Sequence, residues 1–92
     1  MTEAMPIGLG HQPRVASHFR LQWEAVQKSW VLLYPEGMVQ LNDSAAEILK
    51  RCDGERTVAE IVSELEAAFS VQGLTTQVES LLEEGGRRGW ID

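Results

Sequence analysis

The sequence predicts an α+β fold of the winged helix-turn-helix type, with a three-stranded antiparallel meander followed by three helices. Residues 19–24 alternate apolar and polar side chains, which is the pattern of a half-buried strand. The stretch "WVLLYPEGMVQL" that follows contains two apolar runs joined by a Pro-Glu-Gly turn. After residue 42 the apolar residues recur at spacings of three and four, which indicates helices.

The three strands are expected in the front half of the chain. The second strand is apolar at every position, which is typical of a central strand covered on both faces or of a strand with a large exposed aromatic side chain. In the turn after it, Pro35 presets the first central dihedral, and Gly37 is expected to supply the positive φ of a type I turn followed by a bulge. The expected bounds are Phe19–Glu24, Trp30–Tyr34 and Met38–Leu41.

The first two helices have readable ends. The first helix is expected to start at Asn42 or Asp43, although Ser44 and Glu47 also have capping-box spacing, and Gly54 suits its left-handed stop. In the second helix Thr57 and Glu60 have the same capping-box spacing. Its apolar stripe consists of Val58, Ile61, Val62, Leu65 and Phe69.

The third helix is expected to open at Thr75 or Thr76, with Glu79 completing a capping box after Thr76. We expect it to end at Gly85-Gly86, because each glycine costs up to about 1 kcal/mol in helix propensity. Trp90 and Ile91 are expected to pack the chain end back on the core.

The chain of 92 residues is expected to form one domain over residues 19–92, preceded by a flexible N-terminal arm over residues 1–18. The arm mixes Gly, Pro, His and polar residues without an apolar period. No apolar run reaches the roughly 18 residues of a membrane span, and the first residues do not resemble a signal peptide, so we expect a cytoplasmic protein with no membrane partner. The single cysteine, Cys52, agrees with a reducing compartment.

The charge distribution argues against nucleic-acid binding, which is the usual function of a winged helix. The net charge is −6, and residues 43–92 contain eleven acidic and five basic side chains. The helix in the recognition position, "TTQVESLLEE", has no Lys or Arg, and only Gln77 could read a base edge. Since affinity for nucleic acid comes largely from basic side chains, we expect no nucleic-acid partner, and a DNA-binding or general protein-interaction module remains the alternative.

The residues that could support catalysis are not grouped in a way that suggests an enzyme. His11 and His18 lie in the arm, and Cys52 falls on the apolar stripe of the first helix, where a buried thiol is the simpler interpretation. No His or Cys pair has metal-ligand spacing, and no Gly-rich phosphate loop follows a strand. We therefore expect no catalytic residue, no metal and no cofactor.

A binding module is the remaining class, and the third strand is the place for a site. In a meander this strand has an unpaired edge, which can accept an extended peptide while the third helix forms a wall through Val78, Leu81 and Leu82. The alternative is that these residues are ordinary core beside a short solvated edge, which is the commoner case because peptide receptors are rare. An uncovered edge also permits a homodimer.

A specific resemblance favours the peptide site. The run "WVLLYPEGMVQLNDSAAEILKRCDGERTVAEIVSELEAAF" resembles the pyrroloquinoline quinone (PQQ) biosynthesis protein D family, PqqD. In that family a Trp-Val-Leu-Leu strand, a Pro-Glu turn, a Leu-Asn/Asp helix start, Ile-Leu, Cys-Asp-Gly and Arg-Thr-Val occur in the same order. The resemblance extends from Phe19 to Phe69 and more loosely to Ile91, and it departs from the family at "EEGGRRGW", where a longer apolar stripe is expected.

The resemblance implies a non-catalytic peptide chaperone of winged-helix-like fold, of the kind that recognises the leaders of ribosomally made, modified peptides (RiPPs). Such proteins bind the PQQ precursor peptide, PqqA, and present it to a radical S-adenosylmethionine (SAM) enzyme of the PqqE type, which we expect to dock elsewhere, at Trp90 or the arm. The peptide adds as a strand beside the third strand, against the third helix. The implied peptide-binding residues are Met38, Val39, Gln40, Leu41, Gln77, Val78, Leu81 and Leu82.

Overall fold

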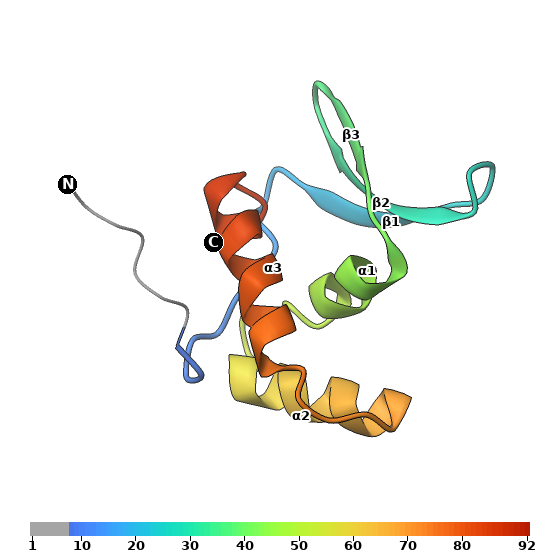
Figure 1. The fold of residues 1–92 in the computed structure, drawn as a ribbon. Helices are drawn as coiled ribbons and strands as arrows, with labels where there is room; N and C mark the ends of the chain where they lie inside the picture. The colour runs from blue at the N-terminus through green and yellow to red at the C-terminus, as the bar shows by residue number, and fades with distance from the viewer. Residues whose placement is uncertain (1–7) are drawn as a thin grey trace.

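The computed structural model describes residues 8–92 and has the predicted order of three strands and then three helices (Figure 1). The strands form one antiparallel sheet in the order β1-β2-β3, so the predicted meander is confirmed, with strand ends within one residue of the expected positions. The bounds are β1 Arg20–Glu24, β2 Ser29–Tyr34, β3 Gly37–Gln40, α1 Asp43–Lys50, α2 Val58–Phe69 and α3 Thr75–Arg87.

The sheet places one row of apolar side chains toward the helices. Leu21 pairs with Leu32, which pairs in turn with Val39, so all three lie on one face of the sheet. Leu32 is fully buried, and the other two pack against the same core. Because β2 is paired on both sides and carries the most buried side chains of the sheet, the prediction of a central strand is confirmed.

The turn between β2 and β3 is tighter than predicted. Tyr34 pairs directly with Gly37, so only Pro35 and Glu36 form the loop. None of these residues has a positive φ, and the expected bulge with a left-handed Gly37 is wrong. The physical reason is that the two-residue loop already reverses the chain, which leaves Gly37 as the first residue of a strand.

Side-chain caps fix the starts of α1 and α2. Asn42 is the N-cap of α1, and its Oδ1 accepts a hydrogen bond from the N–H of Ala45 at 2.8 Å. Thr57 and Glu60 form the predicted capping box at α2, with the Glu60 N–H donating to Thr57 Oγ1 at 3.1 Å and the Thr57 N–H donating to Glu60 Oε1 at 2.8 Å.

Helix α3 has one of its two expected starts but differs from its prediction in its cap and at its C-terminal end. It begins at Thr75, the N-cap position is Leu74, and no side chain caps it, so the predicted capping box at Thr76 is wrong. It also continues through both glycines to Arg87. Gly85 is buried because the chain end packs on it: Trp90 donates its N–H to the Gly85 carbonyl at 2.8 Å, and the Trp90 side chain is only 7% exposed. The helix loses some propensity there and gains this contact.

The elements form layers around one core. In Figure 1, α1 lies between the sheet and α2, and α3 runs along the side of this stack from α2 toward the sheet. The core between them contains residues from β2 and from all three helices, including Leu32, Leu49, Ile61 and Leu82. Within the described part of the chain, no helix is long and apolar enough to span a bilayer.

Residues 8–16, which belong to the flexible arm expected over residues 1–18, make hydrogen bonds with the helical part of the structure. The N–H groups of Val58 and Ala59, at the start of α2, donate to the carbonyls of His11 at 2.8 Å and Leu9 at 3.0 Å. Pro13 and Ala16 are buried. This segment is held because it accepts hydrogen bonds from N–H groups that a helix start leaves unpaired. The part of the expected arm before residue 8 lies outside the described residues.

The same segment is also joined to the end of the chain. Ala16 donates its N–H to the carbonyl of Trp90 at 2.7 Å, and Asp92 donates its N–H to the carbonyl of Arg14 at 2.8 Å. The Arg14 guanidinium lies 3.2 Å from the Asp92 carboxylate. Trp90 therefore belongs to the core and is not available as the enzyme-docking residue that we expected from the sequence.

Candidate functional site

The free edge of β3 is one part of the candidate site. β3 pairs with β2 on one side and is the last strand of the sheet. The N–H of Leu41 donates to the carbonyl of Trp30 at 2.9 Å, which fixes the hydrogen-bonding phase of the ladder. Because hydrogen-bonded and non-hydrogen-bonded pairs alternate in antiparallel sheets, Val39 faces β2, whereas Met38 and Gln40 direct their N–H and C=O groups to the open edge.

The side chains at this edge are of two kinds. Met38 is 44% exposed, and Gln40 is exposed and donates from Nε2 to Ser29 Oγ at 3.2 Å. Val39 is half-buried, and Leu41 is buried in the core. The edge therefore presents backbone groups with Met38 and Gln40 side chains on its outer face.

The helix residues named from the sequence are also divided. Gln77 is exposed and Leu81 is half-buried, so both reach the surface of α3. Val78 and Leu82 are almost completely buried in the core. Among the eight residues implied by the resemblance, only Gln77 and Val78 line the cavity described next.

A groove of about 340 Å³ opens between α1, the last turn of α2 and the first turn of α3. Its floor is apolar and consists of Ile48, Leu65 and Val78, which are buried. Phe69, 52% exposed, and Val71, 43% exposed, stand on its rim. The groove is thus a ready apolar site whose rim side chains are partly in water.

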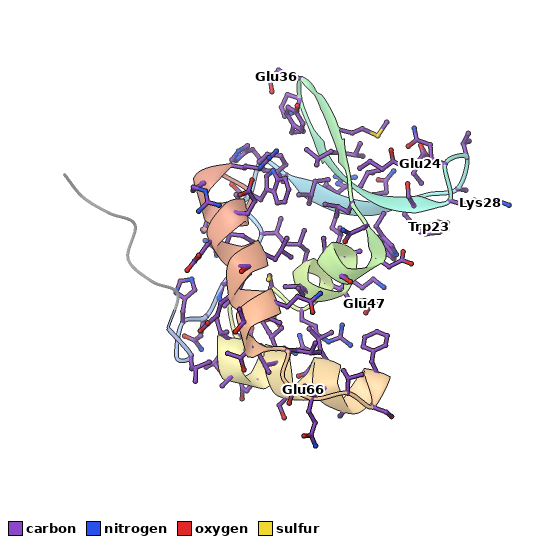
Figure 2. All side chains as sticks on the ribbon, viewed as in Figure 1. Trp23, Glu24, Lys28, Glu36, Glu47 and Glu66 are labelled. Carbon is purple, nitrogen blue, oxygen red and sulfur yellow. The ribbon has the colours of Figure 1, made fainter. Side chains whose placement is uncertain are left out.

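One carboxylate holds the far wall of the groove in place. Glu66 Oε2 accepts the N–H of Gly73 at 2.9 Å and the N–H of Leu74 at 3.1 Å. The α2–α3 connection therefore folds back over Glu66, which Figure 2 shows on α2. This contact positions Leu74 at the groove, and the N–H of Val71 donates separately to the backbone carbonyl of Glu66 at 3.1 Å.

The mouth of the groove is polar and acidic on the α1 side. It contains Asp43, Ser44 and Glu47, with Gln77 opposite on α3, and Figure 2 shows Glu47 between α1 and α2. Glu47 accepts hydrogen bonds from Lys50 and Arg51, both at 3.0 Å, and these hold the pKa of its carboxyl below the ordinary value. Its charge is therefore internally compensated.

Asp43 has a different environment. Across residues 8–92, the structure gives this carboxylate no ion pair with Lys, Arg or His. The side chain is exposed at the start of α1, three residues after Gln40. Asp43 is therefore the carboxylate at the mouth that is available to a cation.

Candidate chemical groups lie away from this groove. The Cys52 thiol is buried, donates to the carbonyl of Ile48 at 3.3 Å, and has its pKa raised to about 12, chiefly by burial. At neutral pH it is a packed thiol, as the sequence suggested. The residues that the structure describes include no cluster of three or more His, Cys, Asp or Glu side chains that could hold a metal ion.

Sequence reasoning missed the groove because it named only one of its walls. Phe69 was assigned to the buried stripe of the second helix, but it stands at the groove rim instead. The signal was present in Phe69 and Val71, two large apolar residues on either side of the position where the helix ends. Their exposure depends on where α1 and α3 lie, which the spacing of one helix does not specify.

The fold and its edge define a class of protein: small winged-helix-like domains with an open edge strand beside a helical groove. The family model for coenzyme PQQ synthesis protein D (PqqD) matches residues 29–91 of the chain. The chain belongs to the PqqD family, as the resemblance indicated.

Curated relatives match the sequence of this chain over most of their length. A PqqA binding protein of Pseudomonas fluorescens is 49% identical over 81 residues, which cover 87% of this chain and 89% of the relative. A PqqA binding protein of Methylococcus capsulatus is 44% identical over 72 residues, or 78% of this chain and 77% of the relative.

A solved structure has the same fold. It is the solution NMR structure of the PqqD part of Methylobacterium extorquens PqqCD, described as a functional and stand-alone RiPP recognition element. Its TM-score is 0.71 at 26% identity, and the match covers 95% of this chain and 97% of that one. The likeness confirms the winged-helix-like meander and three helices.

Proposed function

We propose that this protein binds the ribosomal precursor peptide of PQQ biosynthesis by adding it as a further strand to the edge of β3. The names of the relatives, PqqA binding proteins, and the recognition element of similar fold support this proposal. The single observation that carries it is the position of β3 at the end of the sheet, with an open edge. Strand addition obtains affinity from main-chain hydrogen bonds, which such an edge supplies.

The backbone phase of β3 identifies the groups that would bind. The N–H and C=O groups of Met38 and Gln40 face outward, so they are the pair that a peptide strand would engage. Val39 and Leu41 hold the strand to β2 and to the core. On α3 the contact residues would be those that reach the surface, Gln77 and Leu81, while Val78 and Leu82 support them from below.

Isothermal titration of the folded protein with a synthetic PqqA peptide tests the proposal. We expect heat of binding with a dissociation constant in the micromolar range or below. No heat at tens of micromolar, with the protein folded by circular dichroism, would overturn it.

Two variants at one position separate the backbone from the side chain. Met38→Pro removes an N–H that faces the open edge, and edge positions of this kind tolerate proline. Met38→Ala keeps the N–H and shortens the side chain. If the peptide adds as a strand, Met38→Pro weakens binding at least tenfold relative to Met38→Ala. Equal affinities for the two folded variants would exclude strand addition.

Val39→Pro is the matched opposite case. The Val39 N–H faces β2, so its loss breaks the ladder between β2 and β3 and is expected to lower stability. The protein should therefore unfold at a lower urea concentration than Met38→Pro. If Met38→Pro keeps its stability while Val39→Pro loses it, any loss of peptide binding in Met38→Pro does not come from an unfolded sheet.

We further propose that the protein is a cytoplasmic, non-catalytic adaptor that presents the bound peptide to a radical SAM enzyme of the PqqE type. The buried, neutral Cys52 supports a role without catalysis by this chain. Gel filtration of the chain, the synthetic peptide and the purified enzyme tests presentation. Co-elution of all three supports it, and elution of the enzyme without the chain contradicts it.

The acidic surface of α3 supports the absence of a nucleic-acid partner. Arg87 and Arg88, the basic residues of this region, both pair with Glu84. We therefore expect no binding to duplex DNA in a mobility-shift assay at low salt. Binding that weakens steeply as salt is added would favour the DNA-binding alternative instead.

A further inference from the structure

The groove between α1 and α3 continues the path that a peptide on β3 would take. Asp43, at the groove mouth, follows Gln40 by three residues, which span at most about 11 Å. A peptide that runs along β3 toward the C-terminal end of this strand therefore arrives at the first turn of α1. The groove begins at that turn.

Exposed apolar side chains occur both on β3 and at the rim of the groove. The part of the chain that the structure describes has six large hydrophobic residues with high exposure, and three of them are Met38 on β3 and Phe69 and Val71 on the groove rim. Water contact at these side chains is unfavourable, and an apolar group placed against Phe69 and Val71 would remove it there. The arrangement suits an extended partner that covers first the strand and then the groove.

The size and charge of the groove specify what it would hold. A 150 Å³ apolar cavity accommodates a benzene-sized group, so about 340 Å³ gives room for one aromatic ring or two aliphatic side chains. The floor offers no charged group, since it consists of Ile48, Leu65 and Val78. At the mouth, Asp43 is the carboxylate without an internal cation, so a Lys or Arg beside the apolar group would complete the pair.

We propose that the groove is an anchor subsite for the precursor peptide, which inserts one bulky apolar side chain flanked by a basic residue that pairs with Asp43. The inference rests on the proposed function and adds a second point of recognition to it. Strand addition reads few side chains, because its hydrogen bonds involve the main chain. The anchor subsite would supply selectivity between peptides that are equally able to form a strand.

The first test measures which methyl groups of the protein respond to a synthetic PqqA peptide. Ile48 lies on the groove floor, whereas Ile91 packs near Gly85 at the far end of α3. In methyl NMR spectra we expect the Ile48 signal to shift and to show contacts with a peptide side chain, and the Ile91 signal to stay in place. A shift of Ile48 with protein concentration alone would show that a second copy fills the groove and would overturn the proposal.

The second test uses variants with a matched control. Phe69→Ala removes an exposed rim side chain, and Val26→Ala removes a side chain that is 90% exposed in the β1–β2 turn, away from the groove. We expect Phe69→Ala to weaken peptide binding about tenfold and Val26→Ala to change it less than twofold. Asp43→Asn should weaken binding two- to fivefold at low ionic strength, and this effect should disappear in high salt.

Substituted peptides identify the anchor. Each apolar residue of the PqqA peptide is replaced by Ala in turn, and each Lys or Arg by Gln. One apolar substitution should weaken binding to the natural protein but have little additional effect on Phe69→Ala, and one neighbouring basic substitution should behave in the same way with Asp43→Asn. Fully additive effects at every peptide position would overturn the anchor.

The outcomes distinguish the anchor from strand addition. If Met38→Pro weakens binding and neither Phe69→Ala nor Asp43→Asn does, strand addition stands and the anchor subsite is wrong. If Phe69→Ala weakens binding and Met38→Pro does not, the groove is supported and strand addition is wrong. If the peptide does not bind to the natural protein, both strand addition and the anchor subsite are wrong.

Discussion

Gly85 lies directly against Ile91: a Cβ atom added at residue 85 would come within 2.9 Å of Ile91 Cγ1. This contact explains why a glycine stands inside α3, where helix propensity alone disfavours it. The chain end approaches the helix so closely that a methyl group at residue 85 has no room. Gly86, one residue later, has no atom from outside its own stretch of helix within 4 Å of the corresponding position.

The two glycines therefore predict opposite effects of alanine. Gly85→Ala forces Ile91 away from the helix, and overpacking of this kind costs roughly 1–3 kcal/mol, which exceeds the gain of up to about 1 kcal/mol in helix propensity. Gly86→Ala gains helix propensity without a cost of overpacking. Urea unfolding should show a lower free energy of unfolding for Gly85→Ala and an equal or higher one for Gly86→Ala. Stabilisation by both substitutions would contradict the contact.

The helix caps predict a second pair of variants. Thr57 caps α2 through its hydroxyl, so Thr57→Ala should lower the free energy of unfolding by about 1 kcal/mol. Thr76 lies inside α3 and makes no cap, so Thr76→Ala should change it by less than about 0.5 kcal/mol. Thermal or urea denaturation of both variants checks this difference. A large loss in Thr76→Ala would favour the capping box that the sequence suggested there.

The turn between α1 and α2 predicts a dependence of stability on pH. The N–H groups of Arg56 and Glu55 donate to Asp53 Oδ1, both at 2.9 Å, and hold the pKa of this carboxyl below its ordinary value of 3.8. Since the folded-state pKa is the lower one, the stabilisation is present above the ordinary value and is lost as pH falls through the folded-state pKa.

Asp53→Asn removes this titration. The natural protein should be more stable than the variant at neutral pH, and the difference should shrink when urea unfolding is repeated at pH values below about 4. Glu36→Gln, at the tip of the β2–β3 hairpin in Figure 2, removes one negative charge far from the turn and serves as the control. A difference that stays constant with pH would show that Asp53 acts through its neutral hydrogen bonds alone.

The N-terminal segment predicts a large effect of truncation. A chain that starts at residue 18 lacks the carbonyls of Leu9 and His11 that accept from α2, as well as the N–H of Ala16 that donates to Trp90. Each such hydrogen bond contributes about 0.5–1.5 kcal/mol, so this chain should be several kcal/mol less stable than one that starts at residue 8. Urea unfolding of the two chains measures the difference directly. Equal stability would mean that these hydrogen bonds contribute nothing to the stability of the fold, as expected of a flexible arm.

The sequence predicts the parts of the fold that depend on neighbouring residues. The order of elements, the central position of β2 and the box of Thr57 and Glu60 follow from spacing within a few residues, and all are confirmed. The end of α3 depends on Ile91, which approaches Gly85 only in the folded chain. The position of residues 8–16 depends on partners that lie far away in sequence, so no local pattern reveals it.

The candidate site also has one part that local sequence patterns predict and one part that they do not. Period-2 alternation assigns Met38 and Gln40 to one face of β3, but only the hydrogen bond from Leu41 to Trp30 shows which backbone groups face the open edge. The groove needs three helices at once, and its Glu66 contact with the α2–α3 connection has no signature in the spacing of either helix. Sequence reasoning therefore found the strand and missed the groove.

The bonds between residues 14–16 and residues 90–92 have a consequence for synthesis of the protein on the ribosome. The hydrogen bond from the N–H of Ala16 requires the carbonyl of Trp90, and the hydrogen bond to the carbonyl of Arg14 requires the N–H of Asp92. Contacts between residues so distant in sequence slow folding and form late. The sheet can pair as soon as residue 41 has left the exit tunnel, but the segment that closes over α2 gains its last partners only after residue 92 has left it too.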